Sequence, residues 1–247
     1  MATRSLQETV REDGLRIITK RMPFTKRVRV AVAGLVGSAY DELYQLNGLF
    51  HFFEHTAFDG TETRTAEDMD AFQDRYLYTS NAYTEPLVTN YYGEAIHLHF
   101  DKLCDFIFDA YLRSTYPEDQ LEKEKGAIRG EIRGSLDDDS HQVHYALNRL
   151  LWRKNPLRTM GVRGTIADIE KVSRELLFQI KTQWLIPSNT VVIGTGRINH
   201  AELVRNVYRE FPLHEATVSH PVWDLEFPDP PALMRTVLTR PKRENAL

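Results

Sequence analysis

The sequence predicts an α+β fold, in which helices pack on one face of a mainly antiparallel sheet. Three strand-like segments gather near the N-terminus, at 6–10, 15–22 and 28–36. The first two are joined by Asp13-Gly14, a strong hairpin signal. Apolar residues at helical spacing then dominate the chain from 99 to 152, and a further strand follows at 190–195. Strands and helices are therefore segregated, which is typical of this class.

The remaining elements are expected from local signals. A helix beginning at Leu49 is stopped by Asp59-Gly60, and a second follows Thr65, whose hydroxyl can form a capping box with Asp68. Further strands are expected at 79–83 and 88–96. Helices are expected at 99–113, from 118 through 131, and at 141–152, 165–184 and 200–211.

Composition describes an ordinary globular chain and excludes some classes of function. Of the 247 residues 42% are hydrophobic and 27% charged, and the net charge is −4 without a basic stripe, so we expect no nucleic-acid partner. The single cysteine, Cys104, cannot form an internal disulfide. No apolar run approaches the roughly 20 residues of a membrane span, and residues 1–13 do not resemble a signal peptide. We therefore expect a cytoplasmic protein with no membrane partner.

The sequence His51-Phe-Phe-Glu-His55 carries the strongest chemical signal. On a helix, positions i, i+3 and i+4 share one face, so the two histidines can hold one metal ion with Glu54 beside them. Neutral imidazoles are good zinc ligands, and a third ligand would leave the fourth position for water. The metal lowers the pKa of that water to about 7, and a carboxylate such as Glu54 can take its proton and pass it to the leaving amine. The order H-x-x-E-H is the inverted zincin motif.

The segment from Leu121 to Glu131, read with this motif, resembles the pitrilysin/insulinase family of zinc peptidases. In that family a glutamate about 75 residues beyond the second histidine completes the metal site, and 75 residues separate His55 from Glu131 here. The resemblance thus implies zinc bound by His51, His55 and Glu131. Glu124 lies two helical turns before Glu131, on the same face, where the family has a supporting acidic residue.

The resemblance extends over roughly residues 10–215. It includes the segments 34–42, 48–61, 89–92, 161–164 and 187–196, and Ser80-Asn-Ala-Tyr-Thr84, which is similar to the family's edge strand. It implies that Asn81 and Ala82 contact a peptide substrate by β-augmentation. Family enzymes pair two homologous halves, the second supplying an arginine and a tyrosine. We interpret residues 1–247 as a single zinc peptidase domain of the first kind, with an extended tail from about 221. We therefore expect a partner half, as a separate chain or by self-association.

Two functions remain open on the sequence. The first is a zinc metalloendopeptidase that hydrolyses peptides or unfolded polypeptides. The second is a non-catalytic or partner-dependent peptide-binding subunit of an assembly, although the intact ligand set argues against a degenerate scaffold. His97 and His99, which the sequence places at alternate positions of a strand, have no third partner and are interpreted as structural.

Overall fold

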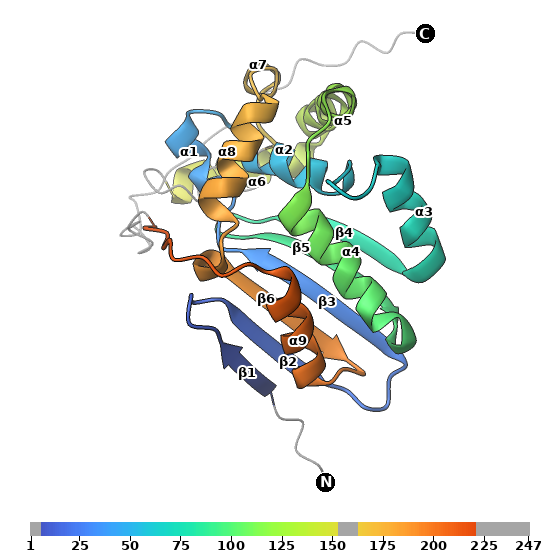
Figure 1. Ribbon diagram of the computed structural model, residues 1–247. Coiled ribbons are helices and arrows are strands. Elements are labelled where there is room, and N and C mark those ends of the chain that lie inside the picture. The colour runs from blue at the N-terminus through green and yellow to red at the C-terminus, as the bar shows by residue number, and fades with distance from the viewer. Residues whose placement is uncertain (1–5, 153–162, 221–247) are drawn as a thin grey trace.

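The computed structural model describes residues 6–152 and 163–220 as a twisted sheet covered by helices (Figure 1). Six strands make up the sheet: β1 (Leu6–Val10), β2 (Arg16–Arg21), β3 (Arg27–Gly34), β4 (Thr79–Thr84), β5 (Thr89–Ile96) and β6 (Thr190–Gly196). Their order is β1-β2-β6-β3-β5-β4. All neighbours are antiparallel except β2 and β6, which run parallel. The expected mainly antiparallel sheet is thus confirmed.

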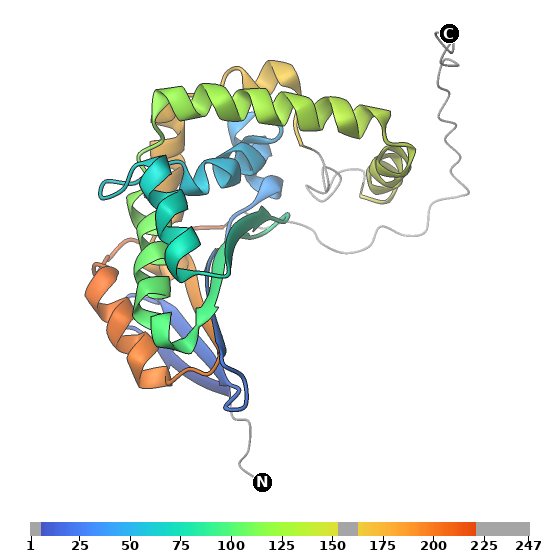
Figure 2. The same ribbon diagram turned by 90° about the vertical axis from the view of Figure 1, so that its right-hand side faces the viewer.

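The helices lie in two groups. Against one face of the sheet lie α4 (Phe100–Arg113), which contacts β3 and β5, and α9 (His200–Glu210), which contacts β2 and β6 (Figure 1). The second group contains α1 (Asp41–Tyr44), α2 (Leu49–His55), α3 (Ala66–Tyr76), α5 (Glu118–Asp137), α6 (Asp139–Leu151), α7 (Ile166–Ile169) and α8 (Arg174–Trp184). In Figure 2, α5 crosses the top of the molecule and α2 lies beneath it.

Burial of apolar side chains of α4 and β3 holds the helices against the sheet. The side of α4 that faces the sheet buries Leu103 and Ile107, both 0% exposed and both next to Gly93 of β5. Burial of one such side chain stabilises a fold by roughly 1.5–3 kcal/mol. On β3 every residue from Val30 to Gly34 is buried, as its apolar sequence predicts for a strand covered on both faces. The buried sheet therefore fixes the position of its edge strand β4, which contacts α2.

Two elements differ from the prediction. The expected helix at 165–184 is divided into α7 and α8, because the hydroxyl of Ser173 accepts the N–H of Leu176 and starts a new helix. His97 and His99 lie on a short 3₁₀ turn after β5, not on a strand. Both hydrogen-bond backbone oxygens through Nδ1, which agrees with a structural role. The expected tail from about 221 lies outside the described residues.

Candidate metal centre

The helix α2 presents its polar residues on one side and its aromatic residues on the other. Phe52 and Phe53 are at most 1% exposed, whereas His51, Glu54 and His55 are partly exposed. The possible ligand atoms of these three polar residues lie within 4.8 Å of one another. Because the apolar side is fixed in the core, the helix cannot rotate the polar side away. The spacing of these three residues in the sequence therefore places their side chains in one fixed cluster on the exposed side of α2.

Asp41 holds the start of this helix. Its carboxylate is buried and accepts two backbone N–H groups, from Gly48 at 2.7 Å and from Phe50 at 3.0 Å. These donors have no partner within the helix, so the carboxylate satisfies them. Burial raises the pKa of Asp41 to about 7. Sequence reasoning missed this residue because it stands well before the helix, where no capping pattern marks it.

Glu131 comes from α5 and faces both histidines. Its Oε2 atom is 3.7 Å from Nε2 of His51, and its Oε1 atom is 3.6 Å from Nε2 of His55. Ligand atoms about 2.0–2.1 Å from a tetrahedral zinc ion stand roughly 3.3–3.5 Å apart. Each of the two nitrogen–oxygen distances is thus within a few tenths of an ångström of this spacing, and the two imidazole rings lie with their centroids 4.6 Å apart. The donor set fits zinc in both chemistry and spacing.

Glu124 stands two turns earlier on α5 and contacts His55 from the other side. Its Oε2 atom is 2.9 Å from Nδ1 of His55. A proton on Nδ1 directed to this carboxylate leaves Nε2, which faces Glu131, free to accept a metal. By contrast, Nδ1 of His51 is buried and has no hydrogen-bond partner among the described residues. The structure therefore orients one imidazole through an acidic neighbour and the other through packing alone.

Burial and charge set the protonation states in the cluster. Burial lowers the pKa of His51 to about 3, with further lowering by His55 and Arg163, so His51 is neutral. Burial also lowers the pKa of His55, but the hydrogen bond to Glu124 and the charges of Glu54 and Glu131 outweigh it, and the pKa lies above its ordinary value. Burial raises the pKa of Glu54. A raised pKa brings this carboxylate closer to the range in which a general base works at neutral pH.

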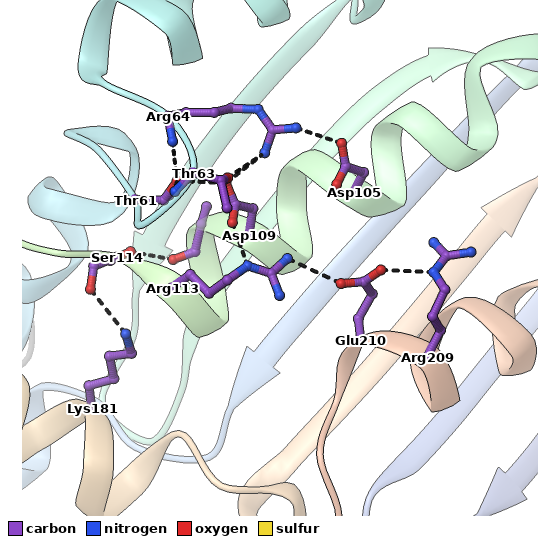
Figure 3. A network of polar contacts seen from close by, with 11 residues as sticks. Thr61, Thr63, Arg64, Asp105, Asp109, Arg113, Ser114, Lys181, Arg209 and Glu210 are labelled. Carbon is purple, nitrogen blue, oxygen red and sulfur yellow. Dashed lines mark hydrogen bonds and ion pairs between the residues drawn. The ribbon is translucent and has the colours of Figure 1, made fainter.

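The loop after α2 is fastened to α4 through the buried carboxylate of Asp109 (Figure 3). Asp109 accepts the hydroxyls of Thr61 and Thr63 and pairs with Arg64 and Arg113 at 2.6 Å. Burial alone would raise the pKa of Asp109, but these hydrogen bonds hold it below its ordinary value. The loop that follows α2 and its 3₁₀ turn is therefore tied to α4.

Asn81 and Ala82 lie on β4, at the edge of the sheet. Asn81 is exposed, and its Oδ1 atom accepts the N–H of Ala82, which is buried. The strand contacts α2, and the hydroxyl of Thr84 donates to the carbonyl of Phe50 at 3.1 Å. The edge strand therefore adjoins the helix of the metal cluster, while contact of Asn81 and Ala82 with substrate stays a prediction.

Replacing Glu124 with alanine should weaken zinc affinity by about 10- to 100-fold, as expected when a histidine ligand loses its carboxylate partner. Glutamine at this position should retain part of the affinity, because its amide oxygen can still accept the Nδ1 proton. Titration of the metal-free proteins with zinc, in competition with a chelator, measures the zinc affinity of both variants. Glu122→Ala is the control, since Glu122 is exposed on the same helix and pairs with Lys125. Equal zinc affinity in Glu124→Ala and Glu122→Ala would contradict the role of Glu124.

No helix in the described ranges, 6–152 and 163–220, is long and apolar enough to cross a membrane. The cytoplasmic location stays a prediction.

Solved structures share this fold. The periplasmic protease PqqL from Escherichia coli matches with a TM-score of 0.79 and 21% identity, over 90% of this chain and 25% of that chain. A protease from Helicobacter pylori matches with a TM-score of 0.79 and 20% identity, over 91% of this chain and 54% of that one. At such identities the likeness concerns the fold.

Curated relatives are named as zinc proteases and as a processing peptidase subunit. An uncharacterised zinc protease of Streptomyces coelicolor is 28% identical over 207 residues, 84% of this chain and 45% of the relative. The mitochondrial-processing peptidase subunit beta of Saccharomyces cerevisiae is 28% identical over 203 residues, 81% of this chain and 43% of the subunit. The chain thus spans about half the length of the curated relatives it matches.

The model of the family described as insulinase, peptidase family M16, matches residues 16–162, which is more than half of the chain. The protein therefore belongs to this family of peptidases, as its sequence resemblance predicts.

Proposed function

We propose that this chain is the catalytic half of a zinc metalloendopeptidase that hydrolyses peptides or unfolded polypeptides. The convergence of His51, His55 and Glu131, with Glu54 beside them on the same helix face, carries the proposal. Zinc held by such a ligand set supplies Lewis acidity and lowers the pKa of water at its open position to about 7. The names of the zinc protease relatives support this choice of metal.

Glu54 is the general base in this proposal. Its carboxylate takes a proton as water attacks the scissile carbonyl, and it returns that proton to the nitrogen of the leaving amine as the C–N bond breaks. The raised pKa of Glu54 suits both halves of this transfer. Glu124 keeps His55 oriented through Nδ1 and does not touch the substrate. The two histidines that would hold the metal and the base Glu54 thus lie on adjacent turns of α2.

The peptide would add to the sheet as a strand beside β4, at Asn81 and Ala82. Support comes from the position of β4 at the sheet edge and from its contact with α2. Backbone hydrogen bonds along such an edge bind many sequences, because they do not depend on side chains. Extended or unfolded polypeptides are therefore the expected substrates.

A second homologous half is the expected partner. The chain spans about half of its curated relatives, and exclusion of water strengthens charge stabilisation in amide hydrolysis. The alternative function is a non-catalytic or partner-dependent peptide-binding subunit of an assembly, which hydrolyses no peptide on its own. We favour a separate partner chain over self-association, since no arginine–tyrosine pair of the second half is recognisable in this sequence.

Peptidase assays over a dilution series, combined with native mass spectrometry, test the proposal. We expect chelator-sensitive cleavage of a quenched fluorescent peptide, with activity per chain falling on dilution as the assembly dissociates. Cleavage that requires an added second-half chain would identify a separate chain as the partner, whereas cleavage by this chain alone that falls on dilution would indicate self-association. A monomer with full, concentration-independent activity would contradict the need for a partner, and a zinc-loaded assembly without any hydrolysis would contradict the peptidase proposal.

A further inference from the structure

Arg163 lies in the segment 161–164, which resembles the family, but neither the motif nor the resemblance gives it a role, and in the structure it contacts Glu131 of the metal cluster. Its Nε atom lies 3.0 Å from Oε2 of Glu131. Its Nη1 atom donates to the hydroxyl of Ser135, one helical turn further along α5. That hydroxyl in turn donates to the backbone carbonyl of Glu131 at 2.9 Å. One guanidinium therefore joins two side chains on the same face of α5.

Glu131 is less constrained by packing than the histidines. Its side chain is 39% exposed, whereas those of His51 and His55 are 19% exposed. Two exposed glycines, Gly130 and Gly134, flank it on α5, and a Cβ atom at either would meet nothing within 4 Å. Glycine is a poor helix former and offers no side chain to pack beside its neighbours. The carboxylate therefore needs an external partner to hold its direction.

The backbone that carries Arg163 is pressed against the start of α2. Gly48 and Gly164 have φ values of +84° and +91°, which favour glycine. A Cβ atom on Gly48 would lie 2.5 Å from the carbonyl oxygen of Arg163, and one on Gly164 would lie 2.2 Å from that of Asn47. Neither glycine could carry a side chain at such distances, so the backbones around Gly48 and Gly164 pack directly against each other. Arg163 is thus anchored where the histidine helix begins and reaches the glutamate helix.

We propose that Arg163 is a positioning residue that holds the carboxylate of Glu131 toward the two histidines. The inference rests on the proposed zinc site. A carboxylate has about four lone-pair sites, so Oε2 can accept from Nε while metal-binding positions remain on both oxygens. The planar guanidinium contacts Glu131 and Ser135 together, which a lysine ammonium on a flexible stem cannot reproduce. The side chain therefore fixes the distance between α2 and α5 at the site where both must supply ligands.

Zinc affinity of the metal-free protein, measured by competition with a chromophoric chelator, tests this role. We expect Arg163→Met to weaken affinity by about 10- to 100-fold, the range for outer partners of metal ligands. Arg163→Lys and Ser135→Ala should each cause a smaller loss. Arg129→Met is the matched control, because Arg129 stands on α5 beside Glu131 but pairs with Glu170. Its zinc affinity should equal that of the wild type.

The visible spectrum of the cobalt-substituted protein provides a readout that loss of general stability would not change. We expect Arg163→Met to alter the cobalt bands, since Glu131 would coordinate in a different direction, and Arg129→Met to leave them unchanged. Wild-type zinc affinity and wild-type cobalt bands in Arg163→Met would overturn the proposal. So would tighter zinc binding, because Arg163 would then act only as a repelling charge. A wild-type protein that bound no zinc would instead overturn the proposed function itself, and this inference with it.

Discussion

Replacing Glu54 with glutamine is expected to leave zinc bound and to reduce peptide hydrolysis by about 10²–10⁴-fold, the range for loss of a general base. Glutamine has nearly the same shape, but its amide cannot accept a proton from water. In the proposed site His51, His55 and Glu131 supply the ligands, so the metal should remain. The measurement is kcat for a quenched fluorescent peptide at saturating zinc, together with zinc content per chain.

The control for this variant is Glu122→Gln, which changes the same functional group at an exposed position of α5. We expect it to retain wild-type turnover. Near wild-type turnover in Glu54→Gln would remove Glu54 from the mechanism. Loss of zinc together with activity would instead place Glu54 among the ligands, which the 4.8 Å spread of the His51–Glu54–His55 cluster would allow.

Local features of the fold could be predicted from the sequence because their causes are local. The turn at Asp13-Gly14 joins β1 and β2 as expected, and Thr65 and Asp68 form the predicted capping box. The parallel pairing of β2 with β6 could not be predicted, since it joins segments over 170 positions apart and depends on packing of the whole sheet. The break between α7 and α8 was marked by Ser173, but the apolar spacing on both sides of it favoured one continuous helix.

The residues of the candidate site likewise divide into those that the sequence predicts and those that it does not. The three residues on α2 follow from helical spacing, and Glu124 and Glu131 follow from the resemblance, which supplies the long-range pairing that spacing alone cannot. Asp41 and Arg163 could not be predicted. Asp41, the first residue of α1, accepts backbone N–H groups at the start of α2, and Arg163 approaches Glu131 where Gly48 and Gly164 bring distant segments together. Neither role could be predicted, because the sequence does not show how the backbone brings each residue to its partners.

Replacement of the proposed zinc ligands is expected to give the second large effect. We expect about one zinc per chain in the wild type and none in the double variant His51→Ala/His55→Ala, because a lone carboxylate cannot hold the ion that three ligands share. Single replacement of His51, His55 or Glu131 by alanine should also remove zinc after dialysis. Metal analysis by mass spectrometry gives the stoichiometry.

Thermal unfolding separates loss of the metal site from loss of the fold. A ligand that binds only the native state stabilises it by about 4.1 kcal/mol at 1,000 times its dissociation constant. Added zinc should therefore raise the wild-type Tm by several degrees and leave that of the double variant unchanged. The matched control is His141→Ala/His144→Ala on α6, where Nδ1 of His144 hydrogen-bonds a backbone oxygen of its own helix. This control should keep both the zinc and the shift in Tm, whereas stoichiometric zinc in the α2 double variant would refute the site.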